Sequence, residues 1–147
     1  MVGGVYLQAF DDVRRHFASI KPKRGVLCEL VVMRLLAASP EFRAYATGHE
    51  HAIAKELERV LRVVVHNSRD IGQWWALMGE LGERLGAKGV VPEALSSFAG
   101  VFSGALLDAV PATPRQALAW ELFVRSAWGA MTPGMIKRPR RLNAAAA

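Results

Sequence analysis

Residues 81–93 read LGERLGAKGVVPE and predict the end of one helix and the start of the next. Gly86 and Gly89 predict the helix end, because glycine tolerates the left-handed conformation of a C-terminal cap. Pro92 predicts a helix start, because the first N–H groups of a helix have no partner within it. Apolar residues recur at three- and four-residue steps on both sides: Trp74, Leu77, Met78, Leu81 and Leu85 before the break, and Val91, Leu95, Phe98, Phe102, Leu106 and Val110 after it. This spacing predicts two amphipathic helices that pack into one core.

The rest of the chain also has helical spacing, and no segment alternates like a strand. Thr113, Pro114 and Gln116 predict another helix start, in which proline takes the first helical position and the other two side chains form a capping box. A last apolar stripe follows it and consists of Leu118, Phe123 or Leu122, Ala127 and Met131. Helices are expected near residues 5–19, 24–38, 41–46, 49–67, 71–86, 92–110 and 114–131. The predicted fold class is all-α, with six or seven helices around one core.

Length and charge predict one domain with a basic tail. The chain has 147 residues and 52% apolar content, which suits a single folded domain and disfavours disorder. Four of its 19 basic residues lie within residues 137–141, and all 13 acidic residues precede them, so residues 1–133 carry a net charge of only +2. We expect a domain over residues 1–133 and a basic, disordered tail over residues 134–147. Nucleic-acid binding is therefore not expected of the domain.

Several other classes of protein are excluded by simple counts. The longest uncharged stretch in the apolar part, residues 94–107, has 14 residues, whereas a membrane span needs about 20. The N-terminus has no basic start and meets Asp11 and Asp12 early, unlike a signal peptide. Cys28 is the only cysteine and cannot build a disulfide framework. We expect a cytoplasmic protein in a reduced setting.

No catalytic motif accompanies this helical pattern. The chain has no Gly-rich phosphate loop, no His-Glu-x-x-His, no Cys-x-x-Cys and no serine nucleophile elbow. The sequence leaves enzymatic activity open and favours a protein that is not an enzyme.

Trp74 and Trp75 are adjacent on a predicted helix. Neighbouring helical residues point about 100° apart, so one ring is expected to enter the core while the other stays at the surface. Tryptophan is enriched at interface hot spots. We therefore predict Trp74 and Trp75 as candidates for a protein interface, with a partner or in a homodimer.

Three segments together resemble the globin superfamily, most closely bacterial single-domain haemoglobins and the globin domain of flavohaemoglobins. Residues 81–90, LGERLGAKGV, resemble the family segment L-G-x-x-H-x-x-x-G-V. Residues 31–43, VVMRLLAASPEFR, resemble the second helix and the proline turn into the third, and Ala119-Trp120 resembles the start of the last helix. The resemblance covers residues 10–131 and implies a globin-like fold.

The chain departs from this family where haem iron is bound. Leu85 occupies the position of the proximal histidine, Val32 that of the distal tyrosine, and Ile53 that of the distal glutamine or histidine. Ala46 stands where the family has a phenylalanine on the haem, and Val124 replaces a tyrosine in the last helix. Iron needs a nitrogen, sulfur or oxygen donor, which aliphatic side chains lack. The resemblance therefore implies a globin-fold protein without haem.

The former haem site is expected to be apolar. The resemblance places eight residues around it: Val32, Ala46, Ile53, Leu57, Leu81, Leu85, Val90 and Leu95. Two interpretations stay open. Either these residues form an ordinary, collapsed core, or an apolar cavity survives and binds a hydrophobic small molecule. In both, the protein acts as a sensory, regulatory or accessory module through a pocket or a partner surface, with no cofactor.

Two alternatives retain chemistry at that site. In the first, haem is bound by an unusual ligand, His51 or His49, and the protein handles O2 or NO. In the second, an enzyme uses the former haem cavity as its substrate pocket. The other histidines are not expected to bind iron: His16 lies beside two arginines and is predicted to be solvated, and His66 lies far from Ile53.

Overall fold

The structure is a computed structural model that describes the backbone of residues 2–146 and the side chains of residues 7–93 and 96–136. That part of the chain contains seven α-helices and no strand. The helices are α1 (Val2–Ser19), α2 (Arg24–Ala38), α3 (Pro40–Ala46), α4 (Glu50–His66), α5 (Ile71–Ala87), α6 (Phe98–Ala109) and α7 (Pro114–Ala146). Short 3-10 helices lie at η1 (Lys21–Lys23), η2 (Asn67–Arg69) and η3 (Pro92–Leu95). The predicted all-α fold with six to seven helices is confirmed.

Local sequence sets two of these helix boundaries as predicted. Gly89 has a φ of +85°, and the N–H of Val90 donates to the carbonyl of Leu85 at 3.0 Å, which is the long bond of a Schellman cap. At the start of α7, the N–H of Thr113 donates to Gln116 Oε1 at 2.9 Å. The N–H of Gln116 donates back to Thr113 Oγ1 at 3.1 Å, which completes the capping box.

The predicted helix over residues 92–110 is wrong in its first part. Pro92–Leu95 forms the 3-10 helix η3, and α6 begins only at Phe98. Ser96 accounts for the break, because its backbone N–H and its hydroxyl both donate to the carbonyl of Glu93, at 3.4 and 3.0 Å. A serine side chain that bonds to nearby backbone in this way competes with the α-helical ladder.

Two residues predicted to pack inward are exposed instead. Val91 lies in the connection before η3 and is exposed. Leu118 is exposed because α7 turns Ala119, Trp120 and Phe123 toward the core. The apolar stripes thus predict the helices better than they predict the edge of each buried face.

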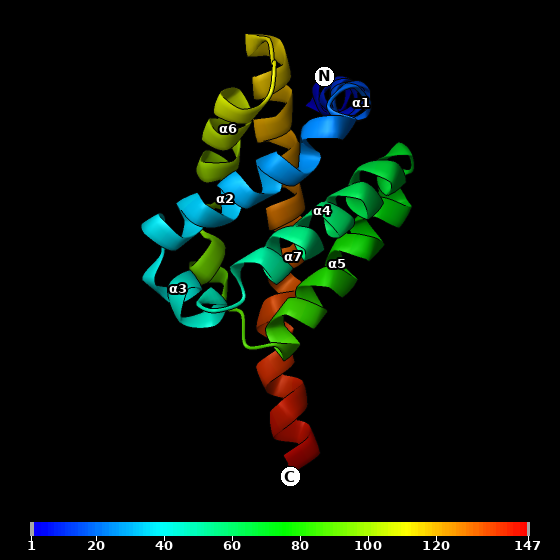
Figure 1. The fold of residues 1–147 in the computed structure, drawn as a ribbon. Coiled ribbons are helices and arrows are strands. Elements are labelled where there is room, and N and C mark those ends of the chain that lie inside the picture. The colour runs from blue at the N-terminus through cyan, green and yellow to red at the C-terminus, as the bar shows by residue number, and fades with distance from the viewer. Residues whose placement is uncertain (1, 147) are drawn as a thin grey trace.

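Helix α7 runs through the middle of the bundle (Figure 1). Helices α1 and α5 pack along it, and α6 lies beside its N-terminal half. Helix α2 contacts both α4 and α6. The core lies between these helices, and its largest fully buried side chains include Trp74, Trp120, Phe102 and Phe123. Among the described residues, no helix has the length and apolar character that a membrane crossing requires.

Helices α5 and α7 touch backbone to backbone at two glycines. A Cβ atom added to Gly82 of α5 would overlap the carbonyl oxygen of Met131. A Cβ atom added to Gly134 of α7 would lie 2.5 Å from the carbonyl oxygen of Gly79. Ordinary contacts between heavy atoms lie at about 3.5–4.0 Å. Only glycine therefore fits at these two positions without moving a helix.

The predicted domain boundary falls at Pro133, inside α7. Gly134 and Met135 are buried, so the packed part of the chain extends slightly past the predicted limit. The last turns of α7 project beyond the other helices (Figure 1). The side chains of residues 137–147 lie outside the described residues, and the disorder expected of the basic tail stays a prediction.

His16 is buried between α1 and α7, with 3% of its surface exposed, so the prediction that it is solvated is wrong. Its Nδ1 accepts a hydrogen bond from the Trp120 indole N–H at 2.9 Å. Its Nε2 lies 2.8 Å from the carbonyl oxygen of Pro111. Because an indole N–H only donates and a carbonyl only accepts, this arrangement requires a neutral imidazole with its proton on Nε2.

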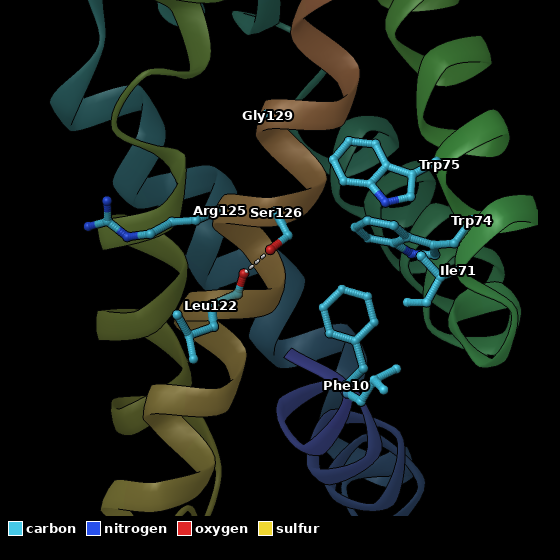
Figure 2. Close-up of a pocket in the computed structure, with 9 residues that line it drawn as sticks. Phe10, Ile71, Trp74, Trp75, Leu122, Arg125, Ser126 and Gly129 are labelled. Carbon is cyan, nitrogen blue, oxygen red and sulfur yellow. Dashed lines mark hydrogen bonds between the residues drawn. The ribbon is translucent and has the colours of Figure 1, made fainter. Parts of the chain in front are cut away.

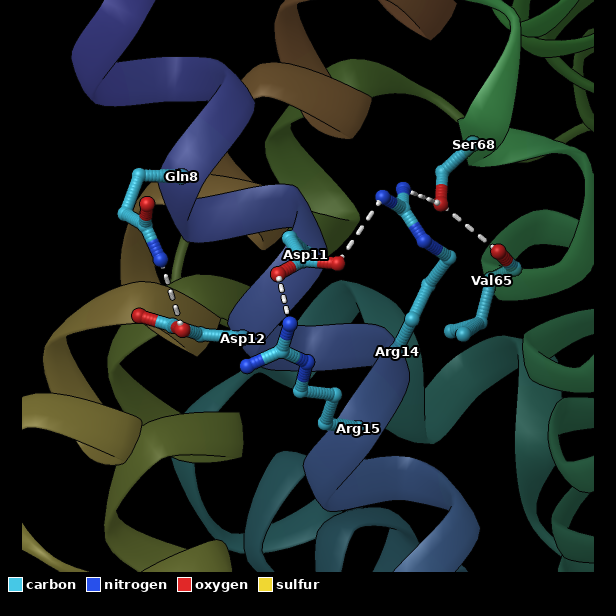
Figure 3. A network of polar contacts seen from close by, with 7 residues as sticks. All are labelled: Gln8, Asp11, Asp12, Arg14, Arg15, Val65 and Ser68. Atoms are coloured by element: carbon cyan, nitrogen blue, oxygen red, sulfur yellow. Dashed lines mark hydrogen bonds and ion pairs between the residues drawn. The ribbon is translucent and has the colours of Figure 1, made fainter.

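The charges next to this histidine are paired in a polar network on α1 (Figure 3). Arg14 and Arg15 both pair with Asp11, at 3.5 and 3.1 Å. Arg14 also donates to Ser68 Oγ at 3.1 Å, and that hydroxyl donates to the carbonyl of Val65 at 2.6 Å. The network links α1 to the end of α4. Arg14 and Arg15 therefore have partners for their charges, although the neighbouring His16 is buried.

We expect His16→Ala to lower the free energy of unfolding by about 2 kcal/mol or more, because it leaves the Trp120 N–H and the Pro111 carbonyl without partners. Urea unfolding measures the change. His66→Ala, at an exposed position at the end of α4, is the control and should stay within about 0.5 kcal/mol of the wild type. In a double-mutant cycle with Trp120→Phe, purely additive effects would contradict the bond.

We expect Gly82→Ala to destabilise the fold by about 2–3 kcal/mol, because the new methyl group would force two helix backbones apart. Gly79→Ala is the control on the same helix. A Cβ atom at Gly79 meets nothing within 4 Å, so that variant should gain about 0.5–1 kcal/mol from higher helix propensity. Thermal and urea unfolding of both variants test the contact. Equal effects of the two substitutions would argue against it.

Candidate functional site

The residues expected around the former haem site are divided between two clusters. Val32 and Ala46 are buried in the main core, and Ile53, Leu57 and Leu81 are half-buried against it. Leu85 and Val90 belong to a second, smaller cluster. The side chain of Leu95 lies outside the described residues. Whether these residues enclose a ligand cavity stays a prediction.

Leu85 is partly buried against a small hydrophobic cluster. The smaller cluster contains Val90 and Met135, both buried, with Leu85 and Trp128 packed against them. Met135 and Trp128 come from α7, which the glycine contact holds close to α5. The position where the resemblance implies an iron ligand is therefore packed by side chains of the neighbouring helix.

The candidate iron ligands lie at the start of α4. His51 has a 70% exposed side chain, and its Nδ1 lies 3.2 Å from the carboxylate of Glu29 on α2. His49, the residue before α4, is also exposed. Coordination requires a donor atom directed at the iron, and these two rings lie at the surface, outside the core clusters. The two histidines thus lie at the surface, and haem ligation by either of them stays a prediction.

Cys28 is likewise no candidate for thiolate ligation. Its side chain is fully buried in the core face of α2. Burial, with a smaller contribution from the Glu58 carboxylate, raises the pKa of the Cys28 thiol to about 12. Thiolate is the form that binds metals, and it is scarce in such a site. Among the described residues, no group of three His, Cys, Asp or Glu side chains is placed to hold a metal ion.

The structure does contain a pocket, and it lies elsewhere (Figure 2). Its volume is about 650 Å³, and it opens between α1, α5 and α7. Its lining residues are Leu7, Phe10, Ile71, Trp74, Trp75, Leu122, Arg125, Ser126 and Gly129. None of the seven described residues among those predicted for the former haem site is in this lining.

The two tryptophans are the predicted site residues that line this pocket. Trp74 is fully buried, whereas Trp75 is 50% exposed, as the angle between adjacent helical residues predicts. Their rings meet edge to face, with centroids 5.9 Å apart. Figure 2 shows the two indoles on one side of the pocket and Leu122, Ser126 and Gly129 of α7 on the other. The pair thus forms a pocket wall, and a role in a protein interface stays a prediction.

Sequence reasoning missed the remaining wall residues. Leu122, Ser126 and Gly129 recur at four- and three-residue steps, so they share one face of α7. Leu7 and Phe10 on α1 show the same three-residue spacing. Both spacings can be read from the sequence. That these faces of α1 and α7 meet is seen only in the packing of the two helices.

Comparison with known proteins adds no assignment. No model of a known protein family matches the chain, and no curated protein is detectably similar to it. The globin resemblance of residues 81–90 therefore carries over only as a proposal.

We expect the stability of the protein to fall between pH 9 and 12 partly through Cys28. The pKa of its thiol is raised from an ordinary value of 9.0 to about 12 in the folded protein, so the native state holds a proton that the unfolded state loses. This stabilisation is complete below pH 9 and is lost as the pH rises toward 12, by up to about 1.4 kcal/mol per pH unit.

Cys28→Ala removes this titration. The difference in free energy of unfolding between the wild type and the variant should therefore shrink from pH 9 to pH 11 in urea unfolding experiments. A difference that stays constant over this range would contradict a protonated, buried thiol.

Proposed function

We propose that this chain is a haem-free protein of the globin fold that works by binding, as a sensory, regulatory or accessory module. The positions of the helix breaks support the fold assignment. The short helix α3 begins at Pro40 directly after α2, and α5 ends in the cap at Gly89. Both features fall where the resemblance to bacterial globins implies them.

The environment of Leu85 carries the proposal. A protein that retained haem would need a donor atom here, and this position holds an aliphatic side chain among Val90, Met135 and Trp128. Burying an unpartnered histidine in the same place would cost about 1–3 kcal/mol. The apolar replacement avoids that cost, which fits a protein whose stability no longer involves iron.

A binding role is supported by the pocket between α1, α5 and α7. Among the described residues, Arg125 is the only titratable side chain in its lining, and it is paired with Glu121 at 3.0 Å. Acid–base catalysis needs a titratable group in reach of the substrate, ordinarily one that is free to exchange a proton. The pocket offers apolar and aromatic surface instead, which favours recognition over reaction.

Titration of the purified protein with haemin tests the proposal. We expect no sharp Soret band at one equivalent. We expect none from Leu85→His either, because Leu85 packs against a cluster that includes Val90 and Met135 and that a haem would have to displace. Optical absorption measures both.

Two results would count against these expectations in different ways. A stoichiometric band in the wild type that vanishes in His51→Ala or His49→Ala would overturn the haem-free assignment. A band that appears only in Leu85→His would leave that assignment intact and show that a haem-sized space survives beside α5.

A further inference from the structure

Of the four histidines, His16 alone is buried. Its imidazole lies between a donor and an acceptor: the indole N–H of Trp120 is 2.9 Å from Nδ1, and the carbonyl of Pro111 is 2.8 Å from Nε2. A neutral ring satisfies both groups, because it accepts at one nitrogen and donates at the other. An imidazolium donates at both nitrogens, so its Nδ1–H would face the N–H of Trp120. The contacts of His16 therefore suit only the uncharged ring.

The carboxylates of α1 near His16 already have partners. Asp12 lies one helical turn before His16, and its two oxygens accept from Gln8 and from Arg115 of α7, both at 3.1 Å. Figure 3 shows the bond from Gln8. The other carboxylate, Asp11, pairs with the two arginines beside His16. Neither carboxylate is free to balance a charge on the imidazole.

The neighbouring helices bring cations or paired charges to this region. Arg24 at the start of α2 lies 3.6 Å from the centroid of the Phe17 ring and donates to the Phe17 carbonyl at 2.6 Å. The Phe17 ring in turn meets the ring of Trp120, with centroids 6.0 Å apart. On α6 the one charged side chain, Asp108, pairs with an arginine of α2. A buried charge without a partner is costly, so a protonated imidazole would be driven toward solvent.

His16 attaches α1 to the corner between α6 and α7. Pro111 and Thr113 in this corner are exposed. A second link runs from Asp12 of α1 to Arg115 in the first turn of α7, and the side chain of that arginine is 71% exposed. Exposed ion pairs contribute little to stability. His16 therefore supplies the buried part of the attachment.

We propose that His16 is a pH-sensitive switch: protonation moves its ring out from between α1 and α7, breaks the bond to Trp120 and frees the corner at Pro111. The charge of a histidine ordinarily changes between about pH 5 and 8. The attachment is complete at the upper end of this range and is lost as the pH falls. The inference goes beyond the proposed function and depends neither on the absence of haem nor on ligand binding.

NMR of the tryptophan indole N–H signals follows the switch from about pH 8 to pH 5. The chain has four tryptophans, and Trp120→Phe identifies the Trp120 signal by its absence. As the pH falls, we expect the proton signal of Trp120 to move upfield further than the other three, because its N–H loses an acceptor. Far-UV circular dichroism should stay unchanged over the same range, since the helices remain folded.

Amide hydrogen exchange measures the release of the corner. The N–H of Thr113, bonded to Gln116 Oε1 at 2.9 Å, reports on the start of α7. The N–H of Val90, bonded to the carbonyl of Leu85 at 3.0 Å, is a matched reference at another helix end. Dividing the two rates removes the direct effect of pH on exchange. We expect the ratio of Thr113 to Val90 to rise about 3- to 10-fold over this range, the effect of about one lost hydrogen bond.

His16→Gln keeps an amide oxygen and an amide N–H and takes up no proton in this range. We expect both pH responses to vanish in this variant. His66→Gln is the matched control, because His66 is exposed at the end of α4. His51→Gln removes the other histidine contact, with Glu29. Both controls should keep the two responses of the wild type.

Trp120→Phe tests the same bond from the other side and serves if His16→Gln does not fold. Without the opposing N–H, the ring signals of His16 should titrate at a higher pH than in the wild type.

Several outcomes would overturn the inference. These are a Trp120 signal that does not respond to pH in the wild type, a constant exchange ratio, responses that persist in His16→Gln, or a His16 titration that Trp120→Phe leaves unchanged. Loss of the far-UV signal with the same midpoint would also overturn it, because the whole fold would then respond instead of the corner.

Discussion

Gly82 of α5 and Gly134 of α7 bring two helix backbones together with no side chain between them. Eight or more residues earlier on each helix, Trp74 and Phe123 lie between the same two helices with ring centroids 5.6 Å apart. Helices that touch at one point and are separated by large rings at another must diverge, and Figure 1 shows α5 and α7 drawing together toward the C-terminal end of α5. The pocket occupies the wider end. The cluster around Leu85 occupies the narrow end. The close contact at Gly82 and Gly134 thus accounts both for the open pocket and for the packed cluster around Leu85.

Below the wider end, aromatic rings lie in mutual contact. Phe10 meets both Trp74 and Phe123 at 4.9 Å, and Phe123 meets Trp120 at 5.8 Å. Trp120 in turn is fixed by its bond to His16. Aromatic side chains have few rotatable bonds, so a site built from them loses little entropy when a ligand binds.

The sequence predicts the parts of this fold that depend on neighbouring residues. The glycine cap at Gly89 and the capping box at Thr113 are local, and both are confirmed. The break at Ser96 was missed because a serine favours a helix end only weakly. The burial of His16 was missed because its partners, Pro111 and Trp120, are distant in sequence and its neighbours are charged.

For the site, the sequence predicts that one of the paired tryptophans is buried, which follows from helix geometry alone. It does not predict the pocket, whose walls come from α1, α5 and α7 and meet only after packing. The family resemblance implies a site around Leu85 instead, and Leu85 lies where α5 and α7 are closest together. Close packing at Gly82 gives little signal in one sequence, because glycine is also used at turns and caps.

Pro133 adds a mechanical property to α7. A proline has no N–H, so the carbonyl of Gly129 has no donor four residues ahead, and the ladder of helix bonds lacks a rung there. Gly129 forms part of the pocket wall, and Gly134 lies in the contact with α5. The stiffness of α7 is therefore lowest between these two points. We therefore expect α7 to bend between Gly129 and Gly134, and to bend less in the segment that carries Trp120 and Phe123.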